Sequence, residues 1–305
     1  MSLSKIKFTK PIIKWIGGKT QILEEILNKF PNTINNYHEV FLGGGSVLLG
    51  LLEYINYGKI KVNKIYAYDY NINLINLYNL IKTNHEKLYN DIIKIVNIYN
   101  SCNILKGDRN AKNIEEAIKS KESYYYWMRN EYNNTTNNIY YKSALFVFLN
   151  KTCFRGMYRV GPNGFNVPFG NYKKPTIINK QHLKKVSDLI QNVKFICIDY
   201  TKSIQYIKIN DFSYLDPPYY PINSKSFVKY NKNGFNLNNH KKLFELCHLL
   251  NKKNIKFIIS NSYTKYVVNE FIKYKNYNIC NITVKRRINS KNPQSTCKEV
   301  IISNY

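Results

Sequence analysis

Features typical of membrane, secreted and metal-binding proteins are missing from this sequence of 305 residues. No unbroken apolar run reaches the roughly 18 residues of a membrane span, and the N-terminal segment has no apolar signal core. The six cysteines include no CxxC pair, which argues against a zinc ribbon and against a disulfide framework. We therefore expect an intracellular protein that is not secreted, does not bind membranes and keeps its thiols reduced.

Acidic residues are also scarce. Lys and Arg number 46 whereas Asp and Glu number only 19, which gives a net charge of +27. A field of this sign attracts a polyanion such as nucleic acid. An A/T-rich genome would enrich Lys, Asn, Ile and Tyr without selection for binding, but its codons also permit Asp and Glu. Codon bias therefore does not explain the shortage of acids, and we expect a nucleic-acid partner.

Apolar residues, by contrast, are plentiful at 44% of the chain, so a folded core is expected. Short apolar runs alternate with helical periods that begin near Ser46, Asn73 and Lys265, a pattern that predicts an α/β fold with a doubly wound, mostly parallel sheet. Two final runs have no helix between them and predict an antiparallel hairpin at the C-terminus. The predicted strands are 37–42, 64–68, 195–198, 212–215, 257–260, 278–285 and 297–304.

The alternation stops between about residues 83 and 170. Residues 115–133 and 142–150 have helical character, and the Gly-punctuated stretch 153–170 predicts a β-hairpin. We interpret 83–170 as an inserted second domain, mainly helical with a β-hairpin. Residues 1–82 and 171–305 would then form the main domain.

The sharpest chemical signal is Asp216-Pro217-Pro218-Tyr219, directly after an apolar run. A strand that ends in this way places a carboxylate and the rigid Pro217 carbonyl at the carboxyl edge of the sheet, where open α/β folds bind ligands. The two acceptors can hold both N–H bonds of an exocyclic amine, and Tyr219 can stack on its base. A Pro-Pro turn in which Asp216 is only a cap has similar weight when this motif is taken alone.

A glycine-rich turn adds a cofactor signal. Residues 38–46 place three glycines at a strand-to-helix turn, where the backbone can approach a ligand closely. Asp69 ends the next strand and is suitably placed to accept from ribose hydroxyls. The turn lacks the third glycine of the dinucleotide fingerprint, so S-adenosylmethionine fits better than NAD. From this turn we expect cofactor contacts by Phe41, Gly43, Gly45 and Ser46.

The segment Lys14-Trp-Ile-Gly-Gly-Lys-Thr20 imitates the end of a phosphate-binding loop. The first glycine of that motif would stand at position 13, which is Ile13, so an ATPase is disfavoured. We instead expect Trp15 and Lys19 to lie beside the cofactor, although Trp15 could also be a core residue.

Taken together, these motifs resemble the Dam family of DNA adenine methyltransferases, in the order cofactor motif, target-recognition region, DPPY motif. The resemblance covers nearly the whole chain. It includes the Lys14 segment, the glycine turn, the DPPY motif and several shorter segments. These are Asn150-Lys-x-Cys-Phe, Phe165-Asn-Val-Pro-Phe-Gly170, Ser260-Asn261-Ser262 and Arg287-Ile-x-Ser.

The resemblance implies a class I methyltransferase fold that uses S-adenosylmethionine and no metal. Trp15, Lys19, Asp69 and Asp216 would contact the cofactor, and Asp199 would meet its adenine. The family recognises duplex DNA, commonly at GATC. Here the hairpin turn is one residue shorter than in the family, and Arg155 stands where a smaller polar residue is usual, so we expect GATC or a close variant. The implied DNA contacts are Lys14, Phe154, Arg155, Met157, Arg159 and Pro168.

We therefore predict a site-specific DNA adenine methyltransferase that acts on the 6-amino group of adenine in double-stranded DNA. A catalytically silent DNA-binding protein is the alternative from another class, but the intact DPPY and cofactor motifs argue against it. Methylation of RNA or of a protein amide would keep the chemistry and change the substrate. No nuclease signature occurs in the sequence, so a cognate restriction endonuclease would be a separate chain.

Overall fold

The computed structural model describes residues 6–222, 234–285 and 296–305. Its contacts group the chain into two compact units. Unit 1 comprises Met1–Gly18, Gly43–Leu49 and Asn71–Gln191, and unit 2 comprises Lys19–Leu42, Gly50–Tyr70 and Asn192–Tyr305. Within the described residues, no helix is both long and apolar enough to cross a membrane.

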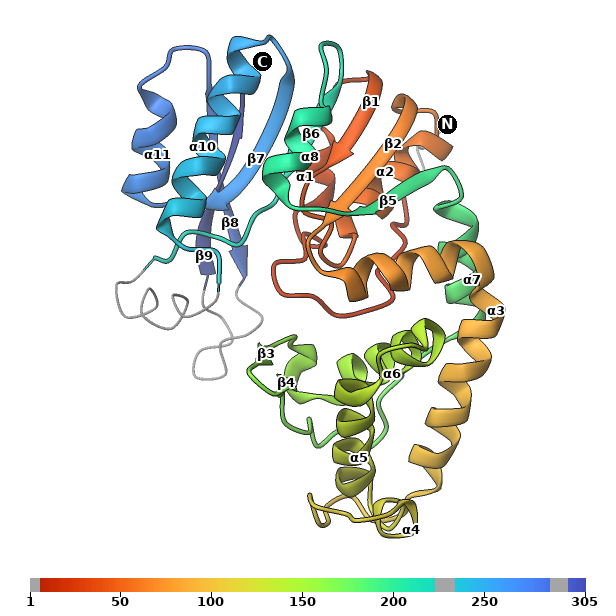
Figure 1. The fold of residues 1–305 in the computed structure, drawn as a ribbon. Helices are drawn as coiled ribbons and strands as arrows, with labels where there is room; N and C mark the ends of the chain where they lie inside the picture. The colour runs from red at the N-terminus through yellow and green to blue at the C-terminus, as the bar shows by residue number, and fades with distance from the viewer. Residues whose placement is uncertain (1–5, 223–233, 286–295) are drawn as a thin grey trace. The chain divides into compact units, whose positions relative to one another are not determined.

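Unit 2 is built on a seven-stranded sheet in the order β5-β2-β1-β6-β7-β9-β8 (Figure 1). Neighbouring strands from β5 to β7 run parallel, and β9 runs antiparallel to both β7 and β8. This arrangement confirms the predicted doubly wound sheet with its antiparallel closing hairpin. The strands are β1 (Thr33–Glu39), β2 (Lys61–Asp69), β5 (Val193–Cys197), β6 (Phe212–Leu215), β7 (Lys256–Ser262), β8 (Asn278–Lys285) and β9 (Thr296–Ser303).

The strand order reverses between β1 and β6, so the chain winds outward in both directions from this point. In open α/β sheets such a reversal opens a crevice at the carboxyl ends of the strands. The ends of β5, β2, β1, β6 and β7 all lie at that edge because these strands are parallel. The edge therefore collects the polar residues that follow each strand.

Helices α10 (Leu237–Lys252) and α11 (Lys265–Ile272) cover one face of the sheet through a shared apolar cluster. Leu243 and Phe244 of α10 and Phe271 of α11 pack there against Phe257 and Ile259 of β7. Two shorter helices, α1 (Leu23–Leu27) and α8 (Tyr200–Ser203), complete unit 2. Helix α2 (Ser46–Asn56) begins at the serine that the sequence predicts as its start.

Unit 1 is mainly helical. Its longest helix, α3 (Ile72–Ser101), has non-helical backbone angles at Asn84, two residues after the predicted domain boundary. The other helices are α4 (Ile114–Ala117), α5 (Lys121–Asn134), α6 (Ile139–Thr152) and α7 (Lys180–Leu189). After a single 3-10 turn, η1 (Phe154–Gly156), the predicted hairpin is present as β3 (Val160–Gly161) and β4 (Gly164–Phe165).

The abundant asparagines have a structural use as helix caps. In α3, α4, α6, α7 and α10 the residue before the helix is an Asn whose side chain accepts a hydrogen bond from a first-turn backbone N–H. Such a cap satisfies a donor that has no partner within the helix. Neither α7 nor α10 was predicted from the sequence, although Leu243, Cys247 and Leu250 of α10 are buried and recur at helical spacing. Their Asn caps were a further signal.

Candidate active site and nucleic-acid interface

The Asp216 carboxylate follows β6 and forms an ion pair with Lys19 in unit 2. Lys19 Nζ lies 2.7 Å from Asp216 Oδ2, and only 3% and 18% of the two side chains are exposed. The other oxygen, Asp216 Oδ1, is buried and has no hydrogen-bond partner among the described residues. Leaving such an acceptor unpaired is costly. Burial raises the pKa of the Asp216 carboxyl, and the nearby Lys19 ammonium offsets only part of that rise.

Tyr219 lies beside this ion pair. Lys19 Nζ is 4.7 Å from the centre of the Tyr219 ring, which is a cation–π contact. The Tyr219 hydroxyl donates a 2.9 Å hydrogen bond to Glu299 of β9, and burial raises the pKa of the phenol well above its ordinary value. The hydroxyl therefore stays protonated and keeps donating to Glu299. The ring is fixed both by this bond and by Lys19.

The Ser260-Asn261-Ser262 segment of β7 holds the DPPY strand and the residue that follows the motif. The Ser260 hydroxyl is 2.8 Å from the hydroxyl of Tyr214, which lies on β6. Asn261 Oδ1 accepts from the Tyr220 backbone N–H at 2.9 Å, and the Ser262 hydroxyl donates to the Tyr220 carbonyl at 2.6 Å. Both polar groups of one peptide residue are thus held by side chains, which fixes the loop that carries Asp216 and Tyr219.

Asp69 and Asp199 lie at the same edge of the sheet. Asp69 is the last residue of β2, opposite Cys197 of the adjacent β5, and Asp199 follows two residues later. Asp199 Oδ1 accepts from the backbone N–H and the hydroxyl of Thr201, so this side chain caps α8. Phe41, after β1, packs on Tyr200 at 5.6 Å between ring centres. Unit 2 therefore brings three of the predicted carboxylates to one sheet edge.

The glycine turn belongs with Trp15 in unit 1. A Cβ atom on Gly43 would lie 2.9 Å from the Trp15 ring, and one on Gly44 would lie 2.8 Å from Trp15 Cβ. Gly43 and Gly45 also have φ of +51° and +72°, which favours glycine. The turn leads into α2, whose first residue, Ser46, is buried. The glycines thus allow close packing by Trp15, whose other side stacks on Tyr158.

The hairpin of unit 1 carries the predicted DNA contacts. Arg159 donates from Nε to Asn166 Oδ1 at 2.6 Å and from Nη2 to the Asn166 carbonyl at 3.1 Å. Both bonds use one side of the guanidinium, which leaves Nη1 and the second Nη2 hydrogen for another acceptor. Phe154, Arg159 and Pro168 are exposed, whereas Met157 is half-buried.

Arg155 has an unusual backbone conformation for its residue type. Its φ is +57°, in the left-handed region that Asn adopts more readily than Arg. Its N–H donates to the Tyr172 hydroxyl, and its guanidinium lies over the Phe154 ring. A smaller polar residue such as Asn would suit this conformation better.

Lys14 is tied to the same unit through its backbone. Asn150 Oδ1 accepts from the Lys14 N–H at 2.7 Å, and Asn150 Nδ2 donates to the Lys14 carbonyl at 2.8 Å. The Lys14 side chain remains exposed and lies over the Tyr172 ring. A Cβ on Gly156 would lie 2.6 Å from the Lys14 side chain, so a glycine is required at 156.

Several polar residues of these sites were missed by sequence reasoning. Glu299 gave no signal because its partner Tyr219 is 80 residues away in the chain. Asn133, whose amide bonds to the backbone of Phe165, lies in an Asn-rich stretch that gave no signal. Asn150 was visible only as part of a motif. The Arg287-Ile-x-Ser segment of the family resemblance lies outside the described residues.

Several known proteins are similar to this chain over nearly its whole length. A family model described as D12 class N6 adenine-specific DNA methyltransferase matches residues 15–288. Type II methyltransferase M.MjaIII of Methanocaldococcus jannaschii is 37% identical to this chain, over 97% of the chain and 99% of that protein. Type II methyltransferase M1.LlaDCHI of Lactococcus lactis subsp. cremoris is 29% identical, over 97% and 95%. A DNA adenine methylase of Haemophilus influenzae is 30% identical, over 95% and 91%.

Proposed function

Because this chain belongs to the D12 class N6 adenine-specific DNA methyltransferases, we propose that it methylates adenine within GATC, or a close variant, in double-stranded DNA, with S-adenosylmethionine as methyl donor. The family fixes the reaction class. The recognition sequence, the donor and the residue roles below are the proposal. We propose that 83–170 is the target-recognition domain and that the remainder is the catalytic domain.

The observation that carries the proposal is the buried Asp216 Oδ1 beside the Lys19 ion pair, for which the described residues supply no hydrogen-bond donor. A flipped adenine supplies the missing donor, because its amine has two N–H groups. Asp216 and the Pro217 carbonyl hold these groups, while Pro218 stiffens the turn and Tyr219 stacks on the base. The acceptors stabilise the positive charge that develops on the nitrogen.

The methyl donor is proposed to contact Trp15, Lys19, Phe41, Gly43, Gly45, Ser46, Asp69, Asp199 and Asp216. Asp69 accepts from its ribose hydroxyls, and Asp199 faces its adenine while capping α8. When bound, the donor would supply a methyl group on a cationic sulfur. The C–S electron pair would stay on sulfur as the amine forms the N–C bond, and the amine proton would pass to solvent when the product leaves. The residues orient the two reactants and exclude water from them.

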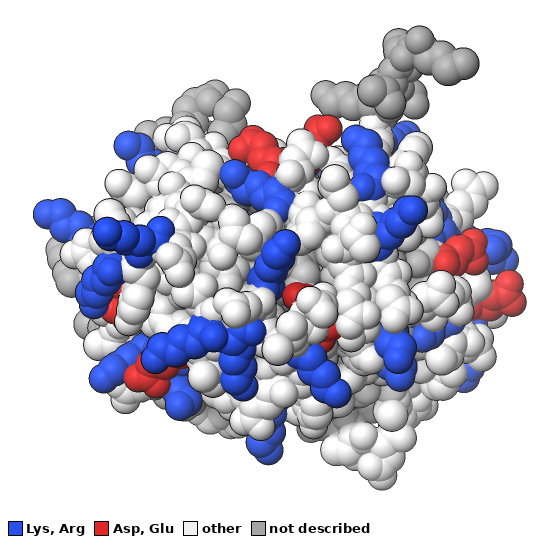
Figure 2. Space-filling model, turned by 90° about the horizontal axis from the view of Figure 1, so that it is seen from above, with Lys and Arg blue, Asp and Glu red and all other residues white. Residues whose placement is uncertain are grey.

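The positive surface supports duplex DNA as substrate. Figure 2 shows Lys and Arg side chains spread over the face in view, with fewer Asp and Glu among them. Such charges bind phosphates without regard to sequence. Sequence reading is assigned to six side chains of unit 1, which are Lys14, Phe154, Arg155, Met157, Arg159 and Pro168.

The two named Type II methyltransferases support a role in restriction-modification, with the cutting activity on a separate endonuclease chain. The DNA substrate would locate the enzyme inside the cell. A silent DNA-binding protein and an RNA methyltransferase are the competing functions. The first predicts no methyl transfer at all, and the second predicts transfer to RNA rather than to duplex DNA.

The experiment is transfer of labelled methyl groups from S-adenosylmethionine to defined oligonucleotides. One duplex contains GATC, four sets change each of its bases in turn, and a matched single-stranded RNA is included. Digestion to nucleosides then identifies the methylated base. We expect N6-methyladenine in the GATC duplex above all others. Equal rates on a scrambled duplex would reject the GATC assignment, and label only in RNA would reject duplex DNA.

A further inference from the structure

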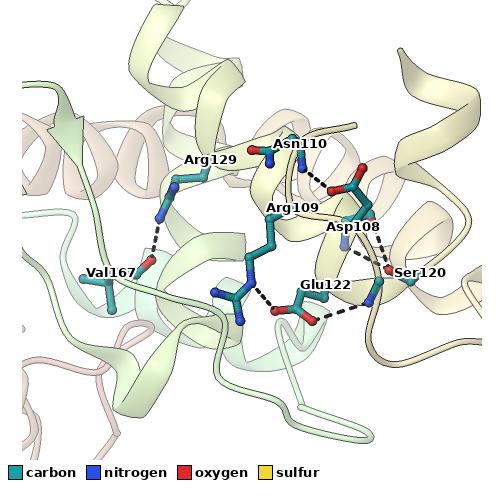
Figure 3. Close-up of polar contacts among 9 residues, drawn as sticks. Asp108, Arg109, Asn110, Ser120, Glu122, Arg129 and Val167 are labelled. Atoms are coloured by element: carbon teal, nitrogen blue, oxygen red, sulfur yellow. Dashed lines mark hydrogen bonds and ion pairs between the residues drawn. The ribbon is translucent and has the colours of Figure 1, made fainter. Parts of the chain in front are cut away.

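One face of α5 holds the hairpin through its main chain. Tyr125, Arg129 and Asn133 follow one another at a spacing of four residues and therefore lie on the same side of the helix. The Tyr125 hydroxyl donates to the Val167 carbonyl at 2.7 Å. Arg129 Nη1 donates to the same carbonyl at 3.4 Å (Figure 3). Figure 3 also shows Arg109 paired with Glu122, which ties the preceding loop to the start of this helix.

Asn133 makes the most specific of these contacts. Its Oδ1 accepts from the Phe165 N–H at 2.8 Å, and its Nδ2 donates to the Phe165 carbonyl at 3.1 Å. The side-chain amide thus pairs with Phe165 as a residue of a neighbouring strand would. A Cβ on Gly164 would lie 2.5 Å from Asn133 Oδ1, so the adjacent glycine is needed for this approach.

The hairpin ladder is short. It has two residue pairs, Val160 with Phe165 and Gly161 with Gly164, and one further backbone bond from the Asn166 N–H to the Arg159 carbonyl. So short a ladder is marginal by itself, and a slip by one residue would turn each side chain to the opposite face. The Asn133–Phe165 pairing fixes β4 from outside, and Asn166, which holds Arg159, is the next residue.

Asn150 makes the same kind of contact with a second segment. Its amide pairs in both directions with the backbone of Lys14, and its Nδ2 also donates to the Gly156 carbonyl at 3.2 Å. Asn150 is 2% exposed. Two asparagines therefore hold the backbones of two segments whose exposed side chains are the proposed DNA readers.

We propose that Asn133 and Asn150 are positioning residues for sequence discrimination, acting through the main chains of Phe165 and Lys14. This inference rests on the proposed function, because it assumes that these segments read DNA. Both amides act on backbone and leave the side chains of Arg159 and Lys14 available to bases. Their loss changes which sites are methylated rather than whether the cofactor binds.

The test uses Asn133→Asp in the full-length enzyme, with Asn134→Ala as the matched control. Aspartate keeps the acceptor for the Phe165 N–H but loses the donor and places a charge against the Phe165 carbonyl. Asn134 is exposed and its amide bonds only Asn130 within the helix among the described residues. Methylation rates are measured on the preferred duplex and on its single-base variants, with S-adenosylmethionine affinity and hydrogen exchange of residues 160–167 measured in parallel.

We expect the ratio of preferred to variant rates to fall roughly tenfold in Asn133→Asp, within the range that one base contact controls. Exchange at 160–167 should rise, cofactor affinity should not change, and Asn134→Ala should match the wild type. Asn150→Asp should relax discrimination at the base read by Lys14.

Faster hydrogen exchange at 160–167 with unchanged discrimination would reduce Asn133 to a structural role and overturn the inference. An equal loss of methylation rate on every duplex would overturn it too. If the wild type methylates no duplex, the proposed function fails and the role in discrimination falls with it, whereas the exchange result still reports on the Asn133–Phe165 pairing.

Discussion

The sheet edge in unit 2 and the hairpin in unit 1 position their functional groups in opposite ways. At the sheet edge the functional side chains themselves are held in place. Asp216 forms an ion pair with Lys19, and Tyr219 donates a hydrogen bond to Glu299. In the hairpin Asn133 and Tyr125 hold the backbone, while Arg159 is exposed and bonds to Asn166 through one side of its guanidinium. Catalysis of one reaction requires charged groups in fixed positions. Recognition of a DNA sequence requires side chains that can reach the bases from a rigid backbone.

The largest effect is expected where a buried charge is removed. Asp216→Asn keeps the size of the side chain but replaces the charged acceptor with an amide, so methyl transfer should fall at least about 100-fold. Labelled methyl transfer at saturating cofactor measures it. The matched control is Asp188→Asn, an exposed carboxylate of α7 paired only with Lys184 among the described contacts. Near wild-type turnover for Asp216→Asn would remove this residue from the catalytic assignment.

The pH dependence of turnover tests whether Lys19 and Glu299 shift the pKa of Asp216. Transfer requires ionised Asp216, and burial raises its pKa, so activity should fail in acid at a higher pH than for an ordinary aspartate. Lys19 lowers this pKa and Glu299 raises it. Lys19→Met should therefore move the acid limb to higher pH, and Glu299→Gln should move it to lower pH. Profiles of kcat against pH test both, and shifts in the same direction would contradict the assignment.

Arg159→Ala tests whether the exposed hairpin reads bases. A lost bidentate guanine contact should reduce discrimination by about 1 to 3 kcal/mol at one position of the site. Rates on duplexes with single-base changes measure this. Replacing the exposed Lys174 instead should weaken binding to all duplexes alike, if this lysine contacts a phosphate. The slope of log affinity against log salt concentration should then become shallower by about one unit. If Arg159→Ala loses methylation rate equally at every position of the site, Arg159 contacts the DNA backbone rather than a base.

Asp69→Ala separates donor binding from site reading. Removal of the ribose acceptor should weaken S-adenosylmethionine binding by about 1 to 3 kcal/mol. The site preference should not change, because Asp69 lies in unit 2 and the proposed readers lie in unit 1. Calorimetric titration gives the affinity. An unchanged value would show that Asp69 only ends its strand.

The smallest effect concerns strain in the hairpin unit. Arg155→Asn places a residue tolerant of positive φ at a position where φ is +57°, so the free energy of unfolding should rise by about 1 kcal/mol. Urea denaturation followed by circular dichroism measures it. Arg159→Asn, at a position that is not among those with positive φ, is the control and should give no such gain. A loss of stability in Arg155→Asn would mean that the stacking of Arg155 on Phe154 outweighs the strain.

The sequence by itself determined the class of fold and the family. Period-two runs and Gly or Pro punctuation are local, so β6 and β8 have the bounds that the pattern predicts. The DPPY motif is likewise contiguous and could be read directly. Helices α7 and α10 were not predicted, although Leu183 and Val186 of α7 are buried at helical spacing. Leu243, Cys247 and Leu250 of α10 show the same spacing.

Only the tertiary structure decided which residues hold the functional groups in place. Glu299 meets Tyr219, Asn150 meets Lys14 and Asn133 meets Phe165 across separations of 80, 136 and 32 residues. Each is a hydrogen bond between groups that many Asn and Glu residues of this chain could supply equally well. Composition gives no reason to choose among them. The choice follows from strand order and helix face, which bring one particular donor or acceptor within about 3 Å of its partner.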